Sequence, residues 1–142
     1  MAKSMIRVAV LYALLGIGMG VVMGASHDFT SKGVHVHVNL LGWVSMALMG
    51  VIYQVFPAMA RSALARWHFW LHNLSLPVMM AGLYFLLHGR PDAEPLVGIG
   101  SVGVALGFVC FACNAWLHAG NEAASQPAGG RVSPPAAASA AA

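Results

Sequence analysis

Charged side chains are scarce in this sequence. Its 142 residues include seven Lys or Arg and four Asp or Glu, so charged residues make up 8% of the chain, whereas soluble domains carry roughly 25%. Hydrophobic residues account for 59% of the chain, and its mean hydropathy is +0.75. This composition excludes an ordinary soluble domain and predicts a membrane protein with the lipid bilayer as its surroundings.

The shortage of acidic residues also excludes several kinds of chemistry. All four lie outside the apolar stretches, so no paired carboxylates are placed for acid–base catalysis within a membrane. A serine-nucleophile motif and a glycine-rich phosphate loop are missing as well. The net charge is only +3, and nothing in its pattern predicts nucleic acid as a partner. We therefore expect no catalysis by this chain on its own. The four acidic residues are Asp28, Asp92, Glu94 and Glu122.

Four apolar stretches are long enough to cross a bilayer. About 20 residues at 1.5 Å each span roughly 30 Å of hydrocarbon, and backbone groups in lipid must pair within their own segment, which favours helices. Short connections make consecutive helices antiparallel neighbours. The sequence thus predicts an all-α fold, an integral membrane four-helix bundle with antiparallel up-down topology. The expected helices cover about 5–25, 34–58, 67–88 and 96–118.

The chain divides into one membrane domain and a tail. The four helices form a transmembrane domain over 1–119, and 120–142 is rich in Ala, Pro, Gly and Ser, a composition typical of disorder. Glycines recur every fourth residue in the first and fourth predicted helices, a spacing that lets helix backbones approach closely. These glycines are Gly16, Gly20 and Gly24, and Gly103 and Gly107.

Basic residues predict the orientation. The positive-inside rule favours cytoplasmic N- and C-termini, because only Lys32 and Arg90 then lie outside. The expected location is the bacterial inner (cytoplasmic) membrane, crossed several times, and 120–142 becomes a cytoplasmic tail. The basic residues expected inside are Lys3, Arg7, Arg61, Arg66 and Arg131.

Seven histidines lie near the ends of the predicted helices. A single histidine at a helix end is usually interfacial or hydrogen-bonded, but seven in so small a membrane protein favour a functional role. A haem iron would stabilise an imidazole in lipid, with a hydrogen-bond acceptor at its other nitrogen. The predicted topology places His27, His35, His37 and His88 near the outer surface, and His68, His72 and His118 near the inner one.

One segment resembles a known family. HVNLLGWVSMALMGVIYQVFP, residues 37–57, resembles the second transmembrane helix of subunit I of the haem–copper oxidase superfamily, especially its nitric oxide reductase and cbb3-like branches. LARWHFWLHNLSLPVMMAGLYFLL, residues 64–87, is similar to the third helix of that family. The resemblance covers roughly 8–90. It implies that His37 is an axial ligand of a low-spin haem.

The resemblance also has a limit. The family holds its copper, its high-spin haem and the second ligand of its low-spin haem on helices that this chain lacks. It therefore implies a short homologue of the N-terminal helices, with haem b but without oxygen or nitric oxide reduction. A sixth iron ligand is expected from His88, from His27, or from His35 or His37 of a second protomer, so we expect a homo-oligomer or a respiratory-complex subunit.

A second constellation lies toward the inner surface. His68 and His72 are four residues apart and share a helix face, a spacing by which one helix presents two metal ligands. Cys110 and Cys113 share a face of the fourth helix, and His118 follows a turn later. Haem attachment of the c type needs histidine directly after the second cysteine, and Asn114 stands there. These five residues predict an alternative metal site, most plausibly for copper(I).

Three functions follow from these patterns. The leading hypothesis is a b-type haem protein of the inner membrane that transfers electrons or binds a small gas. A copper-binding or copper-handling membrane protein is the first alternative. A non-catalytic accessory subunit of a respiratory complex is the second.

Overall fold

The computed structural model describes residues 1–120, and it is all-helical over that range. Four spans are long and apolar enough to cross a membrane. Three are formed by α1 (Ala2–Ser26), by α5 (Ala63–Leu87), and by the 3-10 turn η2 (Pro91–Ala93) running into α6 (Glu94–His118). The prediction of an all-α, multi-pass membrane protein is confirmed. The predicted tail lies outside the described residues from 121 onward.

The second span is built from three consecutive helical segments. It begins with α2 (Lys32–His37), continues as a π-helix, η1 (Val38–Ser45), and ends with α3 (Met46–Val55). A π-helix pairs residue i with i+5 and is uncommon, particularly at such length. The Asn39 side chain donates to the carbonyl of His35 at 2.9 Å, where the backbone N–H of Asn39 would bond in an α-helix. Sequence periodicity does not predict this segment.

Proline sets the end of the second span. The helix stops at Val55 and not at 58, because Phe56 adopts φ −115° and ψ 82° before Pro57, as residues before proline prefer. Pro57 then opens the short helix α4 (Pro57–Arg61) at its first position, where a missing N–H costs nothing. Ser62 caps the following helix α5 by accepting a hydrogen bond from the backbone N–H of Ala65 at 3.0 Å, a standard N-cap arrangement.

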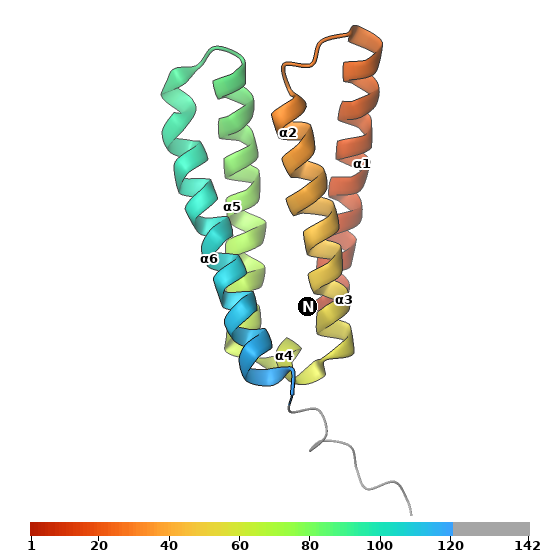
Figure 1. Ribbon diagram of the computed structural model, residues 1–142, viewed down its shortest axis with the longest axis vertical. Coiled ribbons are helices and arrows are strands. Elements are labelled where there is room, and N and C mark those ends of the chain that lie inside the picture. The colour runs from red at the N-terminus through yellow and green to blue at the C-terminus, as the bar shows by residue number, and fades with distance from the viewer. Residues whose placement is uncertain (121–142) are drawn as a thin grey trace, which may run out of the picture.

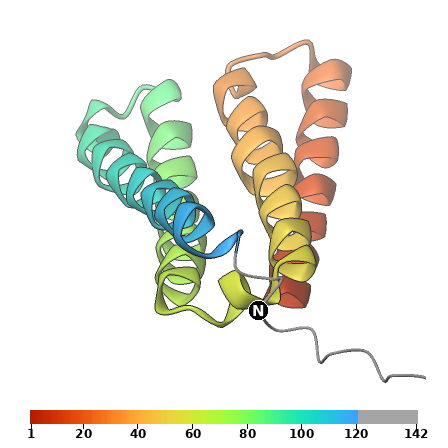
Figure 2. The same ribbon diagram turned by 60° about the horizontal axis from the view of Figure 1, so that its bottom comes forward.

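The helices form two hairpins. Figure 1 shows α1 beside α2 and α3, and α5 beside α6, with α4 crossing between the pairs at the end where the chain begins. Figure 2 shows the same two pairs from another direction, with a separation between them. Side chains close part of this separation, because Val34 and Val38 of the first hairpin share a buried cluster with Leu76, Met79 and Val104 of the second.

Glycine allows the closest contact inside the second hairpin. A Cβ added to Gly100 of α6 would lie 2.5 Å from the backbone nitrogen of Met79 in α5, and one on Gly82 would lie 2.8 Å from the backbone nitrogen of Val97. The expected helix contacts hold for Gly16, Gly20, Gly103 and Gly107, each of which faces a residue of the partner helix. Gly24 has nothing within 4 Å, so the predicted contact at that residue is wrong.

We predict opposite effects for two neighbouring glycines of α6. Gly100→Ala should destabilise the protein by about 1–3 kcal/mol, because the added methyl meets backbone that cannot rotate away. Gly98→Ala is the matched control, since a Cβ there meets nothing within 4 Å, and it should be neutral or stabilising by up to about 1 kcal/mol. Unfolding in detergent micelles measures both. Equal stability of the two variants would contradict the close α5–α6 contact.

Candidate cofactor groove and buried histidine cluster

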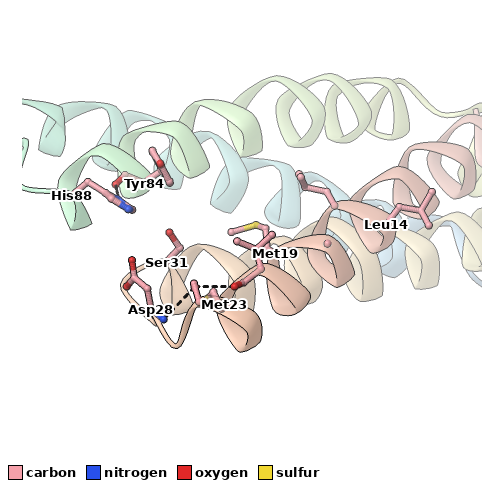
Figure 3. Close-up of a pocket in the computed structure, with 11 residues that line it drawn as sticks. Leu14, Met19, Met23, Asp28, Ser31, Tyr84 and His88 are labelled. Carbon is pink, nitrogen blue, oxygen red and sulfur yellow. Dashed lines mark hydrogen bonds between the residues drawn. The ribbon is translucent and has the colours of Figure 1, made fainter.

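A groove lies between α1 and α5 at the end opposite the N-terminus. Its volume is about 580 Å³, and apolar groups form most of its wall. Figure 3 shows Met19 and Met23 of α1 on one side, and Tyr84 of α5 with His88, the residue that follows α5, on the other. A Cβ at Gly18, which also lines the groove, would meet nothing within 4 Å. The site can therefore accept a large, mostly apolar ligand.

His88 is the imidazole of this groove. Its Nδ1 lies 2.7 Å from the carbonyl oxygen of Tyr84, and its ring stacks on the Tyr84 ring with 4.1 Å between centroids. A carbonyl only accepts, so Nδ1 carries the proton. In the neutral imidazole Nε2 then holds the lone pair, as in histidines that ligate metals.

A carboxylate stands at the mouth of the groove. Asp28 accepts hydrogen bonds from the hydroxyl and the backbone N–H of Thr30, at 2.6 and 2.9 Å. These bonds, with a smaller contribution from His88, lower the pKa of the Asp28 carboxyl. The Asp28 side chain is therefore an anion at neutral pH, close enough to interact with His88.

The other three outer histidines do not line the groove. His35 donates from Nδ1 to the carbonyl of Gly16 at 3.0 Å, which ties the second span to α1. His37 donates from Nδ1 to Gly33 of its own helix at 2.8 Å, again leaving Nε2 without that proton. His27 ends α1 in the left-handed conformation with φ 55° and is exposed. The ligand roles predicted for these histidines stay predictions.

His68 and His72 form a cluster between the two hairpins. Both side chains are completely buried, and their rings meet edge to face at 5.7 Å between centroids. The hydroxyl of Tyr53 in α3 lies 3.0 Å from Nδ1 of His68. His72 donates from Nε2 to the carbonyl of Leu41 in the π-helix at 3.1 Å. Each histidine of α5 thus holds a residue of the first hairpin.

Asn114 adds a third buried polar side chain to this cluster. Its amide donates to the carbonyl of Met59 in α4 at 3.0 Å, and it also interacts with the Tyr53 hydroxyl. Three buried side-chain atoms among the described residues have no hydrogen-bond partner: Nε2 of His68, Nδ1 of His72 and Oδ1 of Asn114. An unpaired buried polar atom lowers the stability of a protein by about 1–3 kcal/mol. Packing alone therefore does not account for three such atoms in this cluster.

The cysteines do not join the histidine cluster in a metal-holding group. Cys113 is exposed, Cys110 is half-buried, and both are free thiols. His118 donates from Nδ1 to the carbonyl of Asn114 at 3.2 Å. Within 1–120 no three His, Cys, Asp or Glu side chains are placed to hold a metal ion. Of the five predicted copper ligands, the structure brings together His68 and His72.

Sequence reasoning missed Tyr53 and Asn114 as members of the buried cluster. Both are polar side chains inside an apolar span, which is the signal that was available. The sequence gives no sign that the Leu41 carbonyl accepts a hydrogen bond from His72, because this contact depends on how the two hairpins meet. Comparison with protein-family models, with curated proteins and with solved structures finds no match for this chain.

We predict that Tyr53→Phe destabilises the protein by about 1–3 kcal/mol, because it leaves Nδ1 of His68 buried without its partner. Tyr84→Phe is the matched control: Tyr84 is exposed, and its loss of a hydroxyl should change stability by less than about 0.5 kcal/mol. Thermal unfolding in detergent measures both. Equal values for the two variants would show that the bond between Tyr53 and His68 contributes nothing.

Proposed function

We propose that this protein is a b-type haem-binding membrane protein that transfers electrons or binds a small gas, with haem held in the groove between α1 and α5. The observation that carries the proposal is the geometry of His88. Its Nδ1 proton is fixed on the Tyr84 carbonyl, and its ring lines a largely apolar groove. This combination suits a histidine that would hold a haem iron.

The dimensions and chemistry of the groove suit a macrocycle. Its volume of about 580 Å³ falls within the range of roughly 300–1,000 Å³ that encloses cofactor-sized ligands. Met19 and Met23 line the groove on the side opposite His88, and a methionine thioether can ligate haem iron. Gly18 leaves a gap on α1 where a flat ring meets no side chain.

The residues of the groove have separable tasks. His88 would hold the cofactor, and the Tyr84 carbonyl orients the His88 ring. The apolar wall excludes water. Haem, when bound, supplies one-electron chemistry and an iron that binds small gases. Asp28 keeps a negative charge at the mouth, which favours a cationic redox partner there.

His37 offers a second ligand position on the neighbouring span. Its Nδ1 proton is fixed on Gly33 in the same manner as that of His88, and the resemblance to the haem–copper oxidase family points to it. Because His37 does not line the groove, its use needs a second protomer or a partner subunit. Homo-oligomer formation or membership of a respiratory complex belongs to this proposal.

We predict that protein purified with haem supplementation shows a reduced-minus-oxidised spectrum of the b type. His88→Ala should weaken haem binding by more than about 100-fold, since even residues that only orient a ligand contribute 10- to 100-fold. His27→Asn is the matched control: it changes an outer histidine that does not line the groove and keeps a residue that tolerates left-handed backbone.

The spectrum also separates the alternatives. If His37→Ala abolishes the signal and His88→Ala does not, the groove is not the haem site. Colourless wild-type protein that keeps stoichiometric copper would support a copper-handling protein. Colourless, metal-free protein that co-purifies with an oxidase would support an accessory subunit.

We also propose that the chain lies in a bacterial inner membrane with both termini in the cytoplasm. Four basic residues and no acidic residue of the described chain lie at the end that carries the N-terminus and α4, whereas Asp28, Asp92 and Glu94 all lie at the opposite end. The positive-inside rule places the basic end in the cytoplasm. The four are Lys3, Arg7, Arg61 and Arg66.

Reporter fusions test this orientation. Alkaline phosphatase fused after residue 120 should be inactive, and the same enzyme fused in the connection after α1, at 28–30, should be active, because the enzyme works only outside the cytoplasm. A fluorescent protein fused after residue 120 should give the complementary result. Activity of the phosphatase after residue 120 would reverse the proposed topology.

A further inference from the structure

A second cavity lies at the opposite end of the molecule from the groove. It has a volume of about 340 Å³ and is bounded by the first turn of α1, the last turn of α3, and α4. The break between Val55 and Pro57 creates it, because the chain turns away there instead of continuing the span. Its wall combines apolar groups with two cationic side chains, Lys3 of α1 and Arg61 of α4, and the amide of Gln54.

The floor of this cavity is fixed in place. Tyr53 lines it and is 1% exposed, with its hydroxyl held by His68 at 3.0 Å and its ring edge-on to Phe111. Ala2, a second lining residue, is also buried. The cavity is therefore a formed site with a rigid base, and its two cations project from an exposed rim.

The electrostatic surroundings favour an anion. Arg7 and Arg66 add to the positive charge at this end, and the acidic residues of the described chain are all at the other end. No carboxylate in 1–120 is therefore available to neutralise Lys3 and Arg61 within the cavity. The one ion pair among residues 1–120 joins Arg90 to Asp92, and it lies at the opposite end of the molecule from the cavity.

The position of the cavity selects the kind of anion. It opens where α1 begins and α3 ends, at the level where the headgroups of a bilayer lie. Val51 and Val55, on the last turns of α3, are 49% and 60% exposed, so apolar side chains near Gln54 in the sequence are open to the hydrocarbon. A ligand with a phosphate and acyl chains would satisfy both parts at once.

We infer that this cavity binds the phosphate of an anionic phospholipid, with Lys3 and Arg61 pairing the charge and Gln54 supplying a neutral donor. Basic pockets between membrane helices bind acidic lipid headgroups in this way. A zwitterionic lipid presents the same phosphate together with a cation that Lys3 and Arg61 repel, so we expect preference for phosphatidylglycerol or cardiolipin over phosphatidylethanolamine. This site does not depend on haem binding.

Native mass spectrometry of the full chain in nanodiscs tests the inference. In discs of equal phosphatidylglycerol and phosphatidylethanolamine, wild-type protein should retain phosphatidylglycerol preferentially. The double variant Lys3→Gln, Arg61→Gln should lower that preference about tenfold, since each basic residue near the surface contributes roughly 1 kcal/mol to anionic-lipid binding, reduced by screening.

The matched control is Arg7→Gln, Arg66→Gln. It removes the same charge from the same end without touching the lining of the cavity, so it has the same effect on net charge and on membrane orientation. It should keep most of the preference. Equal losses in the two double variants would overturn the site and leave only general attraction to an anionic surface.

Two further measurements distinguish the ligand source and the effect of misfolding. Phosphatidylglycerol should raise the unfolding temperature of wild type in detergent and raise that of the cavity variant less, a comparison that needs only folded protein. Soluble glycerol phosphate at millimolar concentration should not displace the lipid. If it does, the site binds a free phosphate compound, and the lipid assignment is wrong.

Discussion

The hydrogen bonds of His68 and His72 hold the two helical hairpins together. In lipid the hydrophobic effect does not drive one helix against another, because hydrocarbon solvates apolar side chains as well as protein does. Packing and buried polar contacts must therefore supply the association. His72 bonds to the Leu41 carbonyl and His68 to the Tyr53 hydroxyl, and both bonds cross from α5 to the second span. An imidazole that lost its partner there would be left unpaired in an apolar interior.

The bond from His72 to Leu41 requires the unusual backbone of the second span. A carbonyl in a regular α-helix already accepts a bond from residue i+4 and is partly covered by it. The π-helix over Val38–Ser45 changes this pairing along the stretch that contains Leu41, so its carbonyls are presented differently. π-helical segments often mark functional regions. Here the segment lies between the histidines of the outer end and those of the buried cluster.

The sequence predicted the parts of the fold that depend on composition and failed where the outcome depends on how helices meet. Hydropathy located the four spans, because a long apolar segment in lipid can pair its backbone within itself only as a helix. Hydropathy did not predict the π-helix, since the hydrogen bond from the Asn39 side chain to the His35 carbonyl leaves no periodic pattern in the sequence. The histidines were recognised as a group by their cost in lipid, but their partners were not. His35 and His37 are two residues apart in the sequence, yet His35 bonds to α1 and His37 bonds to its own helix.

Unequal contact along the two hairpins accounts for the groove at the end opposite the N-terminus. The polar contacts of His68, Tyr53 and Asn114 join α3, α4, α5 and α6 near the end where the chain begins. Beyond the apolar cluster of Val38, Leu76 and Met79, the side chains of α1 and of the end of α5 leave the groove open between them. Because the contact at one end is made by specific hydrogen bonds, apolar substitutions in the groove should change its shape without separating the hairpins. A ligand in the groove would then meet a frame that is already fixed, which lowers the entropy that binding must overcome.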